Sequence, residues 1–401
     1  MSTADRIFDT GLLSPVTAGA DGSVSDAAIR LALVDVEVAY LRALEASGIA
    51  PAGLADRMAQ TPIPPAAGLA QRAVLGGNPV IPLLADLREH LPDDVAAWVH
   101  KGATSQDILD SALMLTAHRA RAIVLECLAE TIEQLARLAD THRGTTAAAR
   151  TLTQHSTPTT WGLRFATWLG TVLDARDDLA GLELPAQLGG ASGTLASLVA
   201  LSDGGTAARM PALFAAELGL AQSPAWHTSR APVTRLGDSL VAVTSALGVI
   251  ASNVSTLGRA EIGEVAEPSA HGRGGSSAMP QKQNPVLSVL IRSAALRAPA
   301  LASTLHLCAA MAIDERPDGA WHAEWPTLRE LLRLALGAST IAAELVTGLT
   351  VDADRARHNL ELSGDDILAE RASLTGTTGT AADYVGLSDA LIDAALARAR
   401  S

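Results

Sequence analysis

Residues 107–140, DILDSALMLTAHRARAIVLECLAETIEQLARLAD, contain neither glycine nor proline. Glycine and proline are the residues that most disfavour a helix interior, so the pattern predicts one uninterrupted helix. At 1.5 Å per residue it would be about 50 Å long, several times the usual length of a globular helix. A helix of that length finds enough partners only beside other long helices, which predicts a bundle.

The neighbouring sequence extends this interpretation to most of the chain. Only 3% of the residues are aromatic, while alanine and leucine are abundant, and both features favour helix over sheet. Ser25 is a good N-cap and Gly48 a good stop for a first helix. The sequence therefore predicts an all-α fold with further long helices at 25–48, 234–265, 285–313 and 326–347.

Short stretches rich in glycine, serine, threonine and proline separate the predicted helices, at 187–194, 266–285 and 314–320. Free backbone N–H groups in such loops favour binding and catalysis there. We expect three parts: an N-terminal helical domain at 1–106, a central bundle at 107–350 and a C-terminal helical segment at 351–401. The GRGGSS run at 272–277 lacks the GxGxxG spacing and a preceding strand, which disfavours dinucleotide binding.

Composition narrows the class of protein. The 401 residues include 43 acidic and 30 basic ones, a formal charge of −13, which predicts no binding to nucleic acid. Hydrophobic residues make up 48%, and the mean hydropathy of +0.23 predicts surface buried between subunits.

Other patterns concern redox chemistry, metals and location. Cys127 and Cys308 are the only cysteines, with no CxxC pair and no Cys/His cluster, so we expect neither a disulfide nor a metal site. The first residues lack a secretory pattern, which predicts a cytoplasmic protein. The uncharged run 239–258 contains several hydroxyl and amide side chains, and this predicts a buried helix and no membrane span.

The chain has only two lysines, Lys101 and Lys282, among its 30 basic residues. Lys282 lies in the segment 275–285, GSSAMPQKQNP, two residues before the scarce asparagine Asn284. Hydroxyls, an ammonium, an amide and glycine N–H groups in one loop are typical of an oxyanion site. A polar turn before the next helix is the alternative.

This segment resembles the signature G-S-x-x-M-x-x-K-x-N of the fumarase/aspartase superfamily. HKGATSQD at 100–107 and RTLTQ at 150–154 are similar to its first and second motif regions. GATSQDILD at 102–110, QLGGASGTLA at 187–196 and ERPDGAWHAEW at 315–325 resemble bacterial 3-carboxy-cis,cis-muconate cycloisomerases of aromatic catabolism by the β-ketoadipate pathway. The resemblance implies a long helical bundle, a homotetramer whose active sites combine several subunits, and cofactor-free chemistry on a small polycarboxylate.

In the implied reaction a substrate carboxylate adds across a double bond and forms a lactone. The enzyme stabilises the resulting aci-carboxylate and delivers a proton to carbon. By motif position, Ser276 matches the superfamily's catalytic serine, and Lys282 and Asn284 are the expected donors to the developing charge. Ser277 and Met279 are expected beside the substrate.

The remaining binding candidates come from other segments. Thr104 and Ser105 precede the long helix, where free N–H groups favour a carboxylate, although ordinary capping is an alternative. His100 matches a histidine that contacts substrate in related lyases, and Thr151 and Gln154 match the second motif region. Trp321, His322 and Trp325 are expected to pack at a helix entrance. Arg292 and Arg316 are candidates for pairing with carboxylates or for salt bridges.

The second motif region departs from many superfamily lyases, because Leu152 stands where their Thr-His pair places a general acid. A departing carboxylate needs no proton, so this favours a cycloisomerase over enzymes that expel an amine, unless His155 substitutes. Two alternatives stay open: a lyase of succinyl-type substrates that releases fumarate or nitrite, and a silent structural oligomer. The segment after residue 350 is shorter than in the family, and we expect turnover without it.

Overall fold

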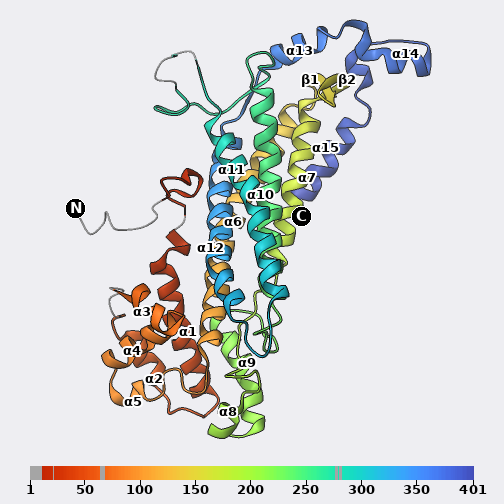
Figure 1. Cartoon of the computed structure of the whole chain (residues 1–401). Helices are drawn as coiled ribbons and strands as arrows, with labels where there is room; N and C mark the ends of the chain where they lie inside the picture. Colours follow the sequence, from red (N-terminus) through yellow and green to blue (C-terminus); the bar gives the residue numbers. More distant parts are fainter. Residues whose placement is uncertain (1–10, 21, 64–67, 276–278, 280–281) are drawn as a thin grey trace.

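The computed structural model describes residues 11–20, 22–63, 68–275, 279 and 282–401, and long helices dominate it (Figure 1). The all-α class is confirmed. The helices are α1 Asp26–Ala46, α2 Leu54–Gln60, α3 Leu69–Gly76, α4 Val80–His90, α5 Asp93–Ala96, α6 Ser105–Thr141, α7 Trp161–Ala180, α8 Ala196–Leu201, α9 Gly204–Leu218, α10 Ala231–Leu257, α11 Val286–Ala310, α12 Gly319–Thr347, α13 Ala353–Glu361, α14 Ala369–Thr375 and α15 Ser388–Arg400.

Short 3-10 turns and two small sheets complete the chain. The turns are Pro15–Thr17, Gly22–Val24, Gly364–Leu368 and Ala381–Tyr384. The strands are β1 Thr146–Thr151, β2 Gln154–Thr160, β3 Val265–Ala266 and β4 Thr350–Val351, paired antiparallel as β1–β2 and β3–β4.

The central bundle consists of α6, α7, α10, α11 and α12, which run side by side along the long axis (Figure 1). At the crossing of α10 and α11, a Cβ atom on Gly248 would lie 2.5 Å from the Cβ of Ala295, so only glycine permits this approach. At one end of the bundle α1 to α5, α8 and α9 gather, and β1, β2, α13 and α14 lie at the other (Figure 1).

Three of the predicted long helices have nearly the expected limits. Ser25 caps α1, and its Oγ accepts the backbone N–H of Ala28 at 3.2 Å. The predicted helices at 107–140 and 285–313 correspond to α6 and α11.

Two predicted helix limits are wrong. The helix predicted at 234–265 ends at Leu257, because the chain turns and forms β3 beside β4. The helix predicted from Pro326 begins at Gly319, with Pro326 inside it, since the proline costs one backbone hydrogen bond in an otherwise well-packed helix.

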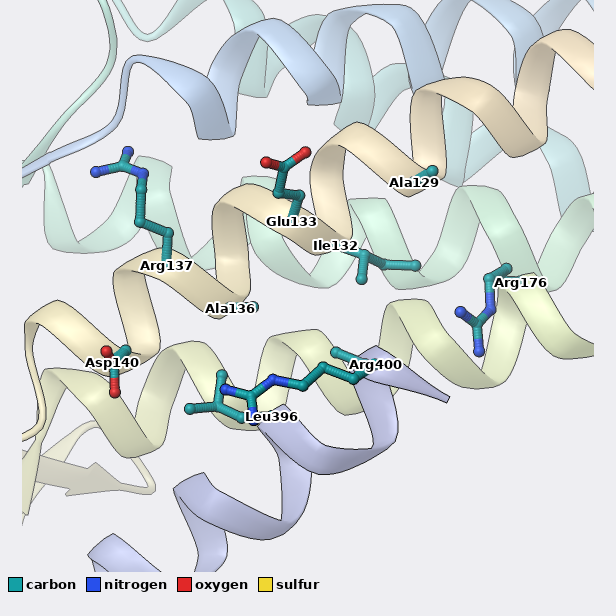
Figure 2. A pocket seen from close by; sticks show the side chains of 10 residues that line it. Ala129, Ile132, Glu133, Ala136, Arg137, Asp140, Arg176, Leu396 and Arg400 are labelled. Atoms are coloured by element: carbon teal, nitrogen blue, oxygen red, sulfur yellow. The ribbon is translucent and has the colours of Figure 1, made fainter.

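Helix α15 returns along the bundle and packs against α6 and α7. Arg398 bonds to Asp174 at 2.6 Å and to Asp177 at 2.8 Å, while Arg143 bonds to Asp393 at 2.6 Å. Beside it, a groove of about 400 Å³ is lined by residues of α6, α7 and α15 (Figure 2). The C-terminal segment is thus packed on the bundle.

Helices α10 and α11 are long and apolar enough to cross a membrane by length and composition alone. In α10, 56% of the most apolar window is buried among other helices, whereas in α11 only 33% is buried. Helix α11 thus exposes an apolar face.

Candidate active site

The first motif region lies at the N-terminus of α6. Thr104 is the N-cap residue, Ser105 is the first helical residue, and both are half-buried. Thr104 and Asp107 form a capping box, in which the Thr104 backbone N–H donates to Asp107 Oδ2 at 3.0 Å. Thr104 therefore caps α6, as the alternative interpretation predicts. The Ser105 hydroxyl takes no part in this cap and could bind a ligand.

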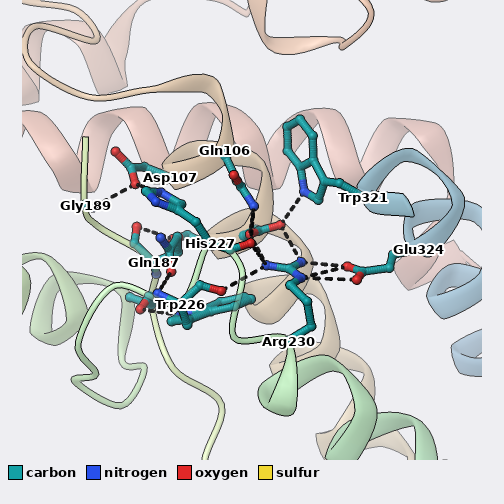
Figure 3. A network of polar contacts seen from close by, with 12 residues as sticks. Gln106, Asp107, Gln187, Gly189, Trp226, His227, Arg230, Trp321 and Glu324 are labelled. Atoms are coloured by element: carbon teal, nitrogen blue, oxygen red, sulfur yellow. Dashed lines mark hydrogen bonds and ion pairs between the residues drawn. The ribbon is translucent and has the colours of Figure 1, made fainter. Parts of the chain in front are cut away.

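Asp107 is fully buried and joins three segments of the chain (Figure 3). Besides Thr104, it accepts hydrogen bonds at 2.9 Å from the backbone N–H groups of Gly189 and Gly190 and from His227 Nε2. An ionised carboxylate carries no proton, so His227 must donate through Nε2. One side chain thus fixes the start of α6 to the loop 187–194.

The loop 187–194 passes so close to its neighbours that glycine is required. A Cβ atom on Gly189 would lie 2.7 Å from His227 Cε1 and 2.8 Å from the Cβ of Ala225. Arg316 reaches the same loop from the segment before α12 and donates to the carbonyl of Ala191 at 2.7 Å. The structure thus brings Arg316 to the first motif region.

Behind these loops lies a buried ionic network around Arg230, shown in Figure 3. Arg230 bonds to Asp110 and to Glu324, each at 2.7 Å in the shortest contact, and Trp321 Nε1 donates to Asp110 at 2.8 Å. Burial by itself lowers the pKa of Arg230, but the two carboxylates hold it above its ordinary value. The network locks α6, α10 and α12 together beneath the candidate site.

His100 and Lys101 also lie beside the first motif region. His100 has a φ of 63° and places Nδ1 2.7 Å from Oε1 of the buried Glu37. Lys101 Nζ stacks 4.0 Å from the ring centre of Trp98, and its carbonyl accepts the hydroxyl of Tyr40. Burial, with the charges of Asp107 and Glu37, raises the pKa of Tyr40, so its hydroxyl stays protonated. Of the two lysines, Lys101 has a structural role.

The second motif region forms the tip of the β1–β2 hairpin. Thr151 and Gln154 are paired and exposed, and between them Leu152 and Thr153 have φ values of 48° and 72°. Leu152 is 96% exposed. His155 places Nδ1 2.6 Å from Ser363 Oγ, which ties the hairpin to the C-terminal segment.

The third motif region is anchored on Gly274, which has a φ of 70°. Its carbonyl accepts the Asn284 backbone N–H at 2.8 Å and Nδ2 at 2.9 Å, and a Cβ on Gly274 would meet the Asn284 carbonyl oxygen at 2.7 Å. Lys282 and Met279 are exposed. Ser276 and Ser277 lie outside the described residues.

A cavity of about 630 Å³ beside this loop is lined by Asn284, Glu267 and Arg273, among others. Glu267 accepts the backbone N–H groups of Leu287 at 3.1 Å and Ser288 at 2.8 Å, so a carboxylate of the chain itself already occupies the N-terminus of α11.

Arg292 lies apart, in a groove of about 400 Å³ between α10 and α11. It is exposed, and the described residues offer its guanidinium no hydrogen bond or ion pair.

Within one chain the motif regions are not brought together. The first lies at the start of α6, whereas the hairpin and residues 266–275 and 282–285 lie toward the opposite end of the bundle (Figure 1). The 37 residues of α6 alone span about 55 Å at 1.5 Å per residue. In the described part of one chain, the first motif region therefore lies far from the other two.

Sequence reasoning missed the buried partners of the first motif region. Asp107, His227, Arg230 and Glu324 lie far apart in the sequence, so no local spacing marks them as one group. The sequence offered only weak signals for this group. Asp107 and Asp110 occur in the segment GATSQDILD, and Glu324 ends the triplet HAE at 322–324. The packing of Trp321 on Trp325, with ring centres 4.7 Å apart, is as expected.

Comparison with known proteins identifies the family. A family profile described as Lyase matches residues 73–299. The chain is 46% identical to a nitrosuccinate lyase from Streptomyces davaonensis, over 94% of this chain and 82% of that one, and 41% identical to a 3-carboxy-cis,cis-muconate cycloisomerase from Pseudomonas aeruginosa, over 92% and 81%. The crystal structure of the 3-carboxy-cis,cis-muconate lactonizing enzyme from Pseudomonas putida superposes with a TM-score of 0.88 at 30% identity, covering 97% of this chain and 99% of that one. The chain therefore belongs to the fumarase/aspartase superfamily of lyases.

Proposed function

We propose that this enzyme closes 3-carboxy-cis,cis-muconate to a carboxymuconolactone without a cofactor. The observation that carries the proposal is Leu152, an apolar side chain at the exposed tip of the hairpin where many superfamily lyases have their general acid. An apolar residue there disfavours eliminations that expel an amine. A lactone opens by expelling a carboxylate, which is stable without a proton, so neither direction of the reaction needs that acid. Relatives and solved structures that carry this activity in their names support the choice of substrate.

In the forward direction a carboxylate oxygen of the substrate forms a bond to one carbon of a conjugated double bond. The displaced electron pair moves into the neighbouring carboxyl group, and the ammonium of Lys282 and the amide of Asn284 stabilise the dianion that forms. Ser276, assigned by its place in the motif, then donates a proton to the carbanionic carbon. Thr104, Ser105, Thr151 and Gln154 bind the carboxylates, with His100 and Arg316 behind them.

The site is shared between copies of the chain in a homotetramer. The separation of the motif regions along α6 supports this, and so does the apolar face of α11, where Val289 is 51%, Leu296 79% and Leu307 65% exposed. An apolar surface of this kind on a helix marks a protein interface.

The chain offers a matched test because it has only two lysines. We expect wild-type protein to remove the ultraviolet absorbance of the conjugated diene, and Lys282→Met to lower kcat/KM on the order of 100-fold. Lys101→Met loses only the contact with Trp98 and keeps turnover. Equal loss in both variants would place Lys282 outside the chemistry, and no turnover by wild type would refute the substrate.

Nitrite elimination is the second candidate, favoured by the relative that is 46% identical. The same site would remove a proton next to a carboxylate of nitrosuccinate and expel nitrite, a weak base that also leaves without an acid. Colorimetric detection of nitrite separates the two reactions. Release of nitrite with no loss of diene absorbance would replace the first candidate, and inactivity on both substrates and on fumarate-releasing ones would leave a silent oligomer.

A further inference from the structure

A cleft of about 590 Å³ lies between the β1–β2 hairpin, α7, the end of α10 and α13. Its lining includes three guanidinium groups, of Arg150, Arg164 and Arg259. Two carboxylates oppose them: Glu261 at the exposed surface and the fully buried Glu264. The cleft therefore carries more cationic than anionic side chains, whereas the chain as a whole has a formal charge of −13.

The buried carboxylate does not satisfy both arginines next to it. Oε1 of Glu264 lies 2.5 Å from Arg150 and accepts Asn359 Nδ2 at 2.9 Å. Oε2 lies 3.6 Å from Arg164 NH1, and neither atom has a hydrogen bond among the described residues. Burial, together with the charge of Arg150, lowers the pKa of Arg164. The charge of Glu264 only partly offsets these two effects on the guanidinium.

Arg259 adds a second available cation at the mouth of the cleft. It is exposed, follows the end of α10, and its guanidinium has no hydrogen bond or ion pair in the described part of the chain. Arg164 is stiffened by stacking 4.5 Å from the ring centre of Trp161. Together the guanidinium groups present donors from three segments, the arrangement that binds carboxylates.

This cleft is distinct from the candidate active site. On the hairpin, Arg150 pairs with His155, and the next pair is Thr151 with Gln154. Adjacent pairs of a two-stranded ribbon point to opposite faces. In agreement with this, Arg150 and His155 line the cleft, whereas the substrate candidates Thr151 and Gln154 do not.

We propose that the cleft is an accessory site for a small polycarboxylate, which links the hairpin through Arg150, α7 through Arg164 and the turn after α10 through Arg259. Its volume accommodates a di- or tricarboxylate, and its donors match carboxylate oxygens. The turn at Arg259 leads directly into the loop 266–285, so a bound anion holds in place the two segments that carry the second and third motif regions. Occupancy then favours the active arrangement, and substrate reciprocally favours occupancy.

The test measures binding and needs no turnover, so its failure is separate from failure of the proposed reaction. The parent is the full-length Lys282→Met variant, which weakens the active site, and the probe is tricarballylate with thermal unfolding as the readout. We expect the probe to raise Tm by several degrees. Arg259→Gln should at least halve this shift, Arg259→Lys should keep most of it, and Arg209→Gln, an exposed arginine on α9, should leave it unchanged.

Three outcomes would overturn the proposal. The first is no shift in the parent, and the second is an equal shift in parent and Arg259→Gln. The third is an equal shift with inorganic phosphate at the same concentration, which would indicate a general anion site and no recognition of a polycarboxylate.

Discussion

Asp107 illustrates how much one buried side chain can organise. Its two oxygens accept four hydrogen bonds, from Thr104, Gly189, Gly190 and His227. Gly189, Gly190 and His227 are buried, so their donor groups cannot find water if the carboxylate is changed. The positions of the start of α6 and of the loop 187–194 therefore depend on this one charge.

We predict that Asp107→Asn destabilises the fold by about 3 kcal/mol, because the amide group turns a donor toward at least one N–H group. Displaced loops should also lower kcat/KM on the order of 100-fold. Thermal unfolding and steady-state kinetics measure both. Asp94→Asn, which breaks only an exposed ion pair with Arg57, is the control, and equal effects in the two variants would contradict the assigned role.

A second prediction concerns the missing general acid. Leu152→His should leave kcat within about threefold of wild type, because the leaving group requires no proton. The fold should tolerate the change, since Leu152 is 96% exposed and histidine accepts a positive φ better than leucine. A large gain in kcat that follows protonation of the new imidazole would show that the reaction does need an acid there.

At the scale of single residues, the sequence could predict only what local patterns encode. Thr104 was recognisable as a cap because capping depends on residues three positions away. The hydrogen bond from Arg316 to the carbonyl of Ala191 joins residues 125 positions apart in the sequence, so only the folded chain reveals it. The proposed roles of Ser276 and Ser277 rest on the motif alone.

At the scale of elements, long helices were predictable where no glycine or proline interrupts them, as in α6. Pro326 misled the prediction because a proline that suits a first helical turn also occurs inside α12. The β1–β2 hairpin escaped prediction as well. Its turn uses Leu152 and Thr153 at positive φ, where Asn-Gly is the usual signal.

The docking of α15 leads to a prediction about pH. The guanidinium of Arg398, together with that of Arg176, lowers the pKa of Asp177 below its ordinary value. A lowered pKa means that Asp177 stabilises the fold above about pH 4 and that this contribution disappears as the pH falls through the lowered pKa. Asp177→Asn should therefore lower Tm at pH 7, and its difference from wild type should shrink as the pH falls below about 4.

The control for this prediction is Asp178→Asn, an exposed neighbour without a hydrogen bond or ion pair in the described residues. A Tm difference for Asp177→Asn that stays constant from pH 7 to pH 3 would contradict the ionic docking of α15. Removal of residues 351–401 would test the expectation that turnover survives without the C-terminal segment. The truncation also removes structural contacts, because Val351 pairs with Val265 and Asn359 bonds to Glu264.

For the whole molecule, composition already indicated more apolar surface than one chain buries, and the exposed face of α11 shows where it lies. We predict that Leu296→Glu dissociates the oligomer and abolishes turnover, as measured by light scattering and activity. Leu374→Glu, at a residue of α14 with a similar exposure of 75%, should keep both. A monomeric and fully active Leu296→Glu protein would disprove shared sites.

The length of helix α6 has a further consequence for the proposed oligomer. It carries the first motif region at one end and leads into the hairpin of the second at the other. In the proposed tetramer with shared sites, its uninterrupted length would set the distance between neighbouring reaction centres. A seven-residue insertion in its middle would keep the apolar stripe nearly in phase yet lengthen the rod by about 10 Å, leaving a folded chain whose copies no longer meet in register.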